Sequence, residues 1–384
     1  MNVPKLRFKE FTDEWNYTCL SEISAEITYG MNSASTEFDG LNKYIRITDI
    51  DDETGNFKPS NLVSPLNKPE DKFLVKKDDI LFARTGASTG KTYLYNIKDG
   101  KLYFAGFLIK AHIVNHNSNF IFQQTKLEKY KKWVKLTSMR SGQPGINSEE
   151  YGKCVFSITS LSEENKIAQF LSLLDKKIEL QTKKIEALKL FKSYTKSEIF
   201  KNGNHVYKLG AILNKWNKKN KDGAINYVES ISNKAGFIPQ SEQFEDRNVA
   251  SKNLRNYYVI KKGVFGYNPS RLNVGSLALK ENDFISVVSP LYECFTTTQN
   301  NTYLFEWFNS NNFKKETFSK FEGGVRNTLN FNNLCDIPIN LPDIETQNQY
   351  AKYFNKINFK ISLEEQKLSK LLKYKKALLQ DMFI

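Results

Sequence analysis

The segment that comes nearest to a catalytic motif is the Gly- and Thr-rich stretch 85–92 (TGASTGKT), which follows an apolar run. A phosphate-binding loop reads G-x-x-x-x-G-K-S/T, because its glycines let backbone N–H groups surround the phosphates. Five residues before Gly90 the chain has Thr85 in place of glycine, and no convincing acidic strand for magnesium follows. We therefore do not expect nucleotide hydrolysis. The segment is either a loop that offers N–H groups, Arg84 and Lys91 to a polyanion, or an ordinary Gly-rich hairpin turn.

Other catalytic patterns are incomplete. Segment 268–271 (NPSR) starts like the Asn-Pro-Pro-Tyr/Phe motif of adenine methyltransferases, but it lacks the second proline and the aromatic residue. The acidic corner 70–72 (EDK) has no partner acid nearby that would complete a nuclease site. His112 and His116 alternate with apolar residues, and neither they nor His205 have a suitable serine or cysteine arrangement, which favours structural roles. We expect no catalytic residue, no metal site and no cofactor.

The charge of the chain points to an anionic partner. Its formal net charge is +14 and its pI is about 9.3. An excess of lysine and arginine is favourable beside a polyanion, so nucleic acid is the first candidate, an anionic membrane surface the second, and a basic surface kept for solubility the alternative.

The cysteines and the apolar runs of the sequence indicate the cellular compartment of the protein. The four cysteines lie far apart and form no Cys-x-x-Cys pair, which fits a reducing compartment. No signal peptide opens the sequence, and no run of about 18 apolar residues could span a membrane. The expected location is the cytoplasm, with no membrane partner.

DNA contacts require side chains that reach base edges, which are Arg and Lys for guanine and Asn and Gln for adenine. The candidates in the first half of the chain lie in or beside loops that contain Gly or Pro: Arg46, Arg84, Lys91, Arg140 and Gln143. The candidates in the second half are Asn268, Arg271, Arg326 and Asn327. Some of them are expected to contact phosphates, which take most protein–DNA hydrogen bonds. A lysine-rich stretch over 183–201 either follows phosphates or is a solvated helix face.

Two segments that must position these residues have similar sequences. Segment 160–200 aligns without a gap on 343–383 at the offset that places residue 200 on residue 383. Both segments have apolar residues at alternating steps of four and three, the periodicity of a coiled-coil seam, and neither contains Pro or Gly. Each segment is therefore predicted to be one helix, roughly 55–60 Å long at 1.5 Å per residue.

The simplest partner for each helix is its own repeat. In the first helix the pairing residues are Leu171, Leu174, Ile178, Gln181 and Leu188; in the second they are Ile357, Ile361, Glu364, Leu371 and Tyr374. Antiparallel pairing would bring Leu174 near Leu371 and would place the polar Gln181 and Glu364 near the middle, where a buried polar layer can fix the register. The alternative is two unrelated surface helices on separate domains.

The regions between the helices repeat more loosely. Residues 15–155 and 205–337 are rich in Tyr, Phe, Ile, Val and Thr in short alternating runs. A similar Gly- and Asn-containing segment lies near the end of each region, 141–147 (SGQPGIN) in the first and 323–330 (GGVRNTLN) in the second. We predict an α+β chain with an internal pseudo-two-fold repeat. Its boundaries are a first domain at 1–157 with an arm at 1–14, a helix at 158–202, a second domain at 203–340 and a helix at 341–384.

This duplicated order resembles the specificity subunits of type I restriction-modification enzymes. The opening 4–8 (PKLRF) with Phe11 and Trp15 looks like their N-terminal signature, and 79–86 (DILFARTG) looks like the D-I-L-x-x-R-x-G element of their target-recognition domains. The two helices resemble their spacers, and the likeness covers nearly the whole chain. The second domain departs from the pattern, because it has 267–269 (YNP) where the first has Arg84-Thr85-Gly86.

The resemblance implies a non-catalytic subunit in which each domain reads one half of a split DNA target and the paired helices set the spacing. The expected partners are double-stranded DNA, two methyltransferase subunits and motor-nuclease subunits. Half-sites about one helical turn apart, roughly 34 Å, would be within reach of such a spacer. Two other classes stay open: a stand-alone, two-headed DNA-binding regulator, and a coiled-coil adaptor whose domains bind protein and show no salt-sensitive affinity for DNA.

Overall fold

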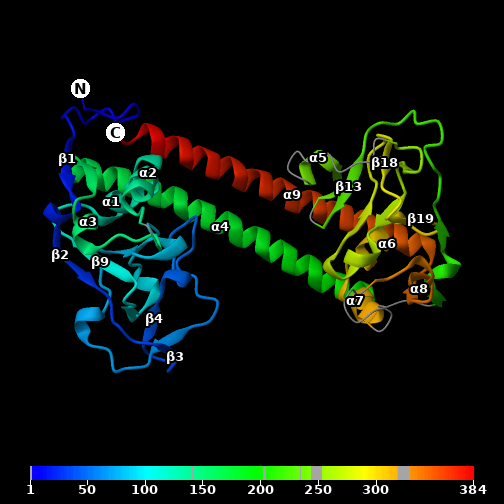
Figure 1. Ribbon diagram of the computed structural model, residues 1–384, viewed down its shortest axis with the longest axis horizontal. Helices are drawn as coiled ribbons and strands as arrows, with labels where there is room; N and C mark the ends of the chain where they lie inside the picture. Colours follow the sequence, from blue (N-terminus) through cyan, green and yellow to red (C-terminus); the bar gives the residue numbers. More distant parts are fainter. Residues whose placement is uncertain (1, 141, 202–204, 234, 244–252, 319–327) are drawn as a thin grey trace. The chain divides into compact units, whose positions relative to one another are not determined.

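The computed structural model describes residues 2–140, 142–201, 205–233, 235–243, 253–318 and 328–384. The chain divides into two compact units. Unit 1 consists of Met1–Gln181 and Lys367–Ile384, and unit 2 consists of Thr182–Gln366. Each unit combines mostly antiparallel strands with short helices and with part of two long helices, α4 (Leu161–Ile199) and α9 (Ile344–Asp381), as Figure 1 shows.

Unit 1 is built on a four-stranded antiparallel sheet with the order β2-β9-β6-β7. Strand β1 pairs with β10 and β3 with β5 in antiparallel fashion, whereas β4 pairs with β8 in parallel. The strands are β1 (Asn16–Cys19), β2 (Ser24–Tyr29), β3 (Ser35–Glu37), β4 (Lys43–Ile45), β5 (Val63–Pro65), β6 (Asp79–Ala83), β7 (Thr92–Leu94), β8 (Leu102–Phe104), β9 (Leu108–Ile113) and β10 (Val155–Ile158). The short helices are α1 (Ser118–Gln124), α2 (Glu128–Thr137) and α3 (Ser148–Gly152).

The central strand β6 is buried on both faces, which explains its unbroken apolar run. Ile80 and Phe82 pack into the core that includes α1 and α4, and the intervening Leu81 and Ala83 pack into a second core that includes β4 and β8. Alternate residues of a strand point to opposite faces, so both sets must be apolar. The loop that follows β6 is therefore held by a strand that is fixed from two sides.

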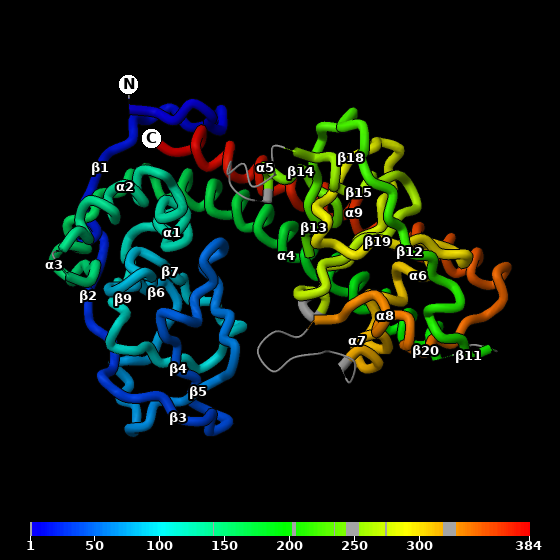
Figure 2. The backbone as a smooth tube through the Cα atoms, turned by 45° about the vertical axis from the view of Figure 1, so that its right-hand side comes forward, coloured from blue at the N-terminus to red at the C-terminus, as the bar shows by residue number. Residues whose placement is uncertain are grey.

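Unit 2 repeats this plan with the sheet order β12-β19-β16-β17, and its backbone can be followed in Figure 2. Its strands are β11 (His205–Lys208), β12 (Leu213–Lys215), β13 (Glu229–Ser232), β14 (Gly236–Pro239), β15 (Tyr258–Ile260), β16 (Phe265–Tyr267), β17 (Leu277–Leu279), β18 (Ser286–Val288), β19 (Glu293–Thr297) and β20 (Pro338–Leu341). Its short helices are α5 (Gln240–Gln243), α6 (Asn301–Phe308), α7 (Asn311–Phe318) and α8 (Phe331–Cys335). Strand β11 pairs with β20 as β1 pairs with β10.

The repeat also holds at the level of single hydrogen bonds. Asn117 caps the start of α1 and donates from Nδ2 to Oδ1 of Asn165 on α4 at 2.7 Å. At the same offset that relates the long helices, Asn300 caps the start of α6 and donates to Asn348 on α9 at 2.7 Å. A hydrogen bond between two asparagine side chains thus joins α1 to α4 in unit 1 and α6 to α9 in unit 2.

Within each unit the long helices pack against each other in opposite directions. In unit 1 the first half of α4 contributes Leu171, Leu174 and Ile178 to a core that Leu368 and Leu371 of α9 cover. In unit 2 Ile199 near the end of α4 shares a core with Phe354 near the start of α9. The predicted fold class, two mixed α/β domains linked by two long helices, is confirmed.

The remaining residues predicted for helix pairing divide by burial. In unit 2 Ile357, Ile361 and Glu364 are buried and Leu188 is half-buried; in unit 1 Gln181 is half-buried. Tyr374, by contrast, is 55% exposed. Near the end of α9 the buried positions are Leu378 and Leu379, because this last part of the helix packs on the globular core of unit 1.

The boundaries predicted for the domains stay predictions, but the compact units divide elsewhere. The division falls inside both long helices, after Gln181 and after Gln366, because each globular part buries its own share of α4 and α9. Among the described helices, none is both long enough and apolar enough to cross a membrane.

Candidate nucleic-acid interface

In unit 1 the loop after β6 is joined to the closing segment of the globular part. The backbone N–H of Ile146 donates to the carbonyl of Arg84 at 2.9 Å, and the N–H of Gly86 donates to the carbonyl of Pro144 at 2.9 Å. Ile146 is buried, and Asn147 caps α3 by accepting from the N–H of Glu150 at 2.8 Å. Two segments far apart in sequence thus form one surface, whose position depends on backbone hydrogen bonds.

Arg84 lies on this surface beside two aromatic rings. Its guanidinium is 4.6 Å from the ring centroid of Tyr29, whose hydroxyl accepts a hydrogen bond from the N–H of Ser148 at 3.1 Å. The N–H of Arg84 donates to the carbonyl of Phe107, whose side chain is 61% exposed. A guanidinium stacked on a ring, next to an exposed ring, can bind bases by stacking and guanine edges by hydrogen bonds.

Gln143 covers the tight turn at the start of the same loop. Gly86 has a φ of +68°, and a Cβ atom on it would lie 2.8 Å from Nε2 of Gln143. This position therefore favours glycine for its backbone conformation, and any Cβ there would displace the Gln143 amide. The structure brings Arg84 and Gln143, two of the residues predicted to bind DNA, to one loop surface.

The other three cations predicted in unit 1 are paired with carboxylates. Arg46 donates to both oxygens of Asp49, at 2.9 and 2.8 Å, and this hydrogen bonding raises its pKa. Lys91 lies 2.6 Å from Asp52, and Arg140 pairs with Glu150. A phosphate or base that binds one of them must therefore compete with, or share, an existing ion pair.

Unit 2 has a similar backbone framework with different side chains. The N–H of Leu329 donates to the carbonyl of Pro269 at 3.1 Å, a bond comparable to that from Ile146 to Arg84 although its acceptor lies two residues further along the aligned loop. Asn268 accepts from the N–H of Ser270 at 3.0 Å and thereby caps the short 3-10 helix Pro269–Val274. The side chain of Arg271 is exposed and has no ion-pair partner within the described parts of the chain. Arg326 and Asn327 lie outside the described residues.

Sequence reasoning missed exposed aromatic residues in both units. In unit 1 they are Tyr29 and Phe107, each next to a glycine. In unit 2 Tyr227 and Phe284 are exposed and pack edge to face, with their ring centroids 4.8 Å apart. An exposed aromatic residue beside a turn is a usable signal in a chain with a large basic excess, because bases stack on such rings.

The lysine-rich part of α4 is not a row of free cations. Within unit 2, Lys184 lies 3.0 Å from Glu364, Lys189 lies 2.6 Å from Glu365, and Lys192 lies 2.6 Å from Glu306. Lys201, which follows the end of α4, pairs with Glu198 of that helix at 2.6 Å. These contacts support helix packing, so the reading of this stretch as a track for phosphates gains no support from them.

The residues considered for catalysis have structural partners. His112 pairs with Asp79 at 2.7 Å and His116 with Glu164 at 2.8 Å, both within unit 1. Burial raises the pKa of the Cys154 thiol to about 12 and that of Cys294 to about 12, which makes both poor nucleophiles at neutral pH. Among the described residues, no group of His, Cys, Asp and Glu is arranged to hold a metal ion. The arrangement offers recognition by cations, amides and rings.

Comparison with known proteins agrees with a role of these surfaces in recognising DNA. Residues 12–190 match the family described as the type I restriction modification DNA specificity domain. The whole chain has the fold of the type I restriction-modification S subunit from M. genitalium, with a TM-score of 0.63, 14% identity, and coverage of 100% of this chain and 99% of that one. It also matches a chain solved for the structural basis of complex assembly and conformational transition of the type I R-M system, with a TM-score of 0.55, 14% identity, and coverage of 96% and 97%.

The repeated units and the matched domain define a class of protein that carries a DNA specificity domain. Within that class, the chain has the fold of a type I restriction-modification S subunit. Residues 12–190 hold its DNA specificity domain, and the S-subunit fold extends over its full length.

Proposed function

We propose that this chain is a specificity (S) subunit of a type I restriction-modification system and that each of its two units binds one half of a bipartite DNA target. The observation that carries the proposal is a main-chain bond of the same kind at both loop surfaces, from Ile146 to Arg84 in unit 1 and from Leu329 to Pro269 in unit 2. The side chains on the two surfaces differ, with Arg84 and Gln143 in unit 1 and Asn268 in unit 2. One scaffold with two sets of base-contacting side chains suits two different half-sites.

The residues proposed to bind DNA are those predicted from the sequence together with exposed aromatic residues of each unit. In unit 1 they are Arg46, Arg84, Lys91, Arg140, Gln143, Tyr29 and Phe107. In unit 2 they are Asn268, Arg271, Arg326, Asn327, Tyr227 and Phe284. Arg84 and Gln143 are proposed to read bases, whereas the carboxylate-paired Arg46, Lys91 and Arg140 suit phosphates.

The proposed partners follow from the same class. Two methyltransferase subunits dock on the S subunit, motor-nuclease subunits join them, and α4 with α9 sets the spacing of the half-sites. The matched chain from a study of complex assembly in a type I R-M system supports a role in such an assembly. The complex acts on the DNA of the cytoplasm.

The experiment is single-molecule methylome sequencing of a host that lacks other type I methyltransferases and expresses the full chain, a type I methyltransferase subunit, or both. A split motif with adenine methylation on both strands should appear only when both proteins are present. Exchange of the first globular part for that of another S subunit should change one half of the motif and leave the other unchanged. If the two proteins fail to associate while the chain alone binds a specific site tightly, the stand-alone regulator replaces this proposal.

A further inference from the structure

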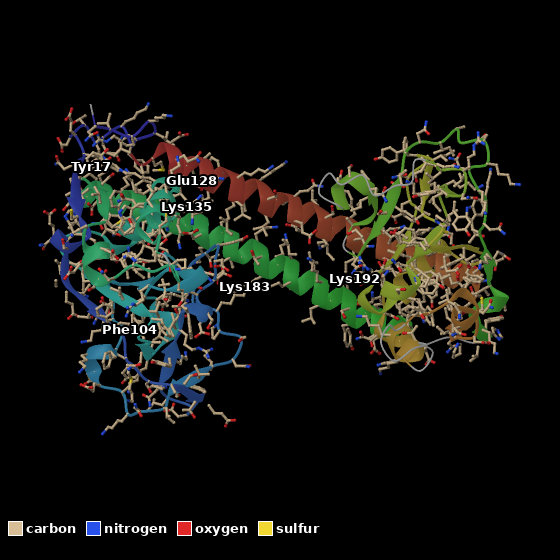
Figure 3. All side chains as sticks on the ribbon, in the orientation of Figure 1. Tyr17, Phe104, Glu128, Lys135, Lys183 and Lys192 are labelled. Carbon is tan, nitrogen blue, oxygen red and sulfur yellow. The ribbon has the colours of Figure 1, made fainter. Side chains whose placement is uncertain are left out.

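Unit 2 contains a basic cavity that the reading of DNA bases does not use. Its volume is about 280 Å³, and it lies between the last turns of α4 and the turn that joins α6 to α7. Figure 3 labels Lys192 on this part of α4. The cavity is lined by lysines and neutral polar residues: Lys189, Lys192, Ser193, Lys196, Ser197, Asn309, Ser310, Asn311, Asn312 and Lys314.

The ammonium groups around the cavity outnumber their carboxylates. No lining residue is acidic; Lys192 and Lys196 share the single buried carboxylate of Glu306, at 2.6 and 3.3 Å. The ammonium of Lys314 has no partner among the residues that the structure describes. Burial lowers the pKa of Lys196, and the nearby ammonium groups of Lys192 and Lys314 lower it further, against the pull of Glu306. Like charges crowd at this point, and a bound anion would relieve their repulsion.

The neutral part of the lining supplies hydrogen-bond donors. Ser193 and Ser197 face the cavity from α4, and Asn311 and Asn312 begin α7, whose first backbone N–H groups are free of intrahelical partners. The N-terminal end of a helix also carries a partial positive charge. Ammonium, hydroxyl, amide and backbone donors together match the oxygens of a phosphate group.

The lysines of the cavity are only partly repeated in unit 1. At the offset of the repeat, Lys189 corresponds to Leu372 and Lys196 to Leu379, so unit 1 lacks two of the four lysines. The volume of the cavity is slightly below the roughly 300–1,000 Å³ of pockets for drug-sized ligands, which suits a single phosphate group better than a whole nucleoside.

We propose that this cavity between α4 and the α6–α7 turn binds one phosphate group, with Lys314 and Lys196 as its main charged contacts. The group is either a free phosphate or a phosphodiester of a DNA backbone, and both present the same oxygens. The proposal does not require that the loops after β6 and β16 read bases.

The test uses the full chain and inorganic phosphate. Thermal unfolding is followed in a phosphate series and in a sodium chloride series of equal ionic strength, and the phosphate affinity is measured by calorimetry. Lys314→Gln should weaken phosphate binding about tenfold, since one charge-assisted hydrogen bond is lost. The matched control is Lys315→Gln, which neutralises the exposed neighbouring lysine on α7 and should leave binding unchanged. Ser197→Ala is a second lining variant and should weaken binding to a smaller degree.

Two results would overturn the proposal. One is equal stabilisation by phosphate and chloride, which would mean screening alone; the other is equal phosphate affinity of the Lys314 and Lys315 variants. A short DNA duplex without a target motif then separates the two sources. If the group is a backbone phosphodiester, the duplex displaces phosphate from the wild type; if the site takes free phosphate, phosphate affinity is unchanged by the duplex.

Discussion

Lys192 on α4 and Glu306 on α6 form an ion pair of 2.6 Å in unit 2, and Glu306 also accepts from Asn358 of α9 at 3.0 Å. The three equivalent residues of unit 1 place the carboxylate on a long helix instead of on the short helix. Lys375 of α9 corresponds to Lys192 and pairs with Asp175 of α4, whereas the position of Glu306 is taken by Gln123. Each unit thus joins a short helix to both long helices with one lysine, one carboxylate and one amide.

Because the carboxylate lies on the short helix in unit 2 and on a long helix in unit 1, we predict that it can be moved from Glu306 of α6 to the position of Asn358 on α9. Glu306 is 3% exposed, so Glu306→Gln leaves two ammonium groups without their carboxylate and should reduce the free energy of unfolding by about 3 kcal/mol. Adding Asn358→Asp recreates the arrangement of Gln123, Asp175 and Lys375 and should restore most of the loss. Urea unfolding of the full chain measures both effects.

The single variant Asn358→Asp is the matched control. It places a second carboxylate beside Glu306 and should destabilise the chain, so that the two changes are favourable only together. A double variant no more stable than Glu306→Gln would show that the two trios are not interchangeable.

The hydrogen bonds that the Asn300 side chain makes at the start of α6 should contribute measurably to stability. Asn300→Ala removes the acceptor for the N–H of Tyr303, at 3.0 Å, and should lower the free energy of unfolding by about 1 kcal/mol. Asn300→Asp keeps an equally good cap but loses the amide N–H that donates to Asn348, so it should retain only part of the stability. The comparison of the two variants in urea unfolding checks the prediction, and equal losses would argue against a capping role.

Lys126 should make the stability of the chain depend on alkaline pH. Burial, and then the charge of Lys375, lowers its pKa to about 8, against the attraction of Asp175 and Asp51. Between about pH 8 and the ordinary lysine value of 10.5, the unfolded chain binds this proton more than the folded chain does. The contribution of Lys126 to the free energy of unfolding should therefore rise with pH across this range and stay constant below it.

Urea unfolding at several pH values compares the wild type with Lys126→Met, which should lack this part of the rise. Lys132→Met changes an exposed lysine on α2 and serves as the control with the wild-type slope. The assignment fails if both variants follow the wild type.

Arg84 should contribute to base recognition through the shape of its guanidinium. Arg84→Ala should raise the Kd for a cognate duplex by about tenfold or more, since a bidentate contact to a base is worth about 1–3 kcal/mol. Arg84→Lys keeps the charge but loses the planar fork, so it should recover little of the affinity. Fluorescence anisotropy of the assembled methyltransferase at fixed salt measures this. Full recovery by lysine would indicate a phosphate contact.

The long helices could be predicted from the sequence, because their heptad spacing and gap-free repeat are local signals. The limit of that signal lies at Tyr374. The periodicity continues through it, but the end of α9 turns its buried side to the globular core, where Phe383 packs on Phe120 with ring centroids 5.1 Å apart. Periodicity records the pairing of helices and does not record where a third element replaces the partner helix.

The candidate interface could be predicted only in part. The closing segments are visible because they repeat, and their Asn147 and Asn330 both cap short helices. The stacking of Arg84 on Tyr29 was invisible, since it depends on how distant strands are ordered in the sheet. The partner of Lys91 was equally hidden, because Asp52 lies on a different loop.

The hydrogen bonds from Ile146 to Arg84 and from Leu329 to Pro269 join main-chain atoms only. A main-chain bond survives almost any change of side chain, provided that the backbone keeps its path. Mutation and recombination can therefore replace the residues displayed on either loop while the attachment of that loop persists. Each half of the gene can change in this way without first giving up a folded protein.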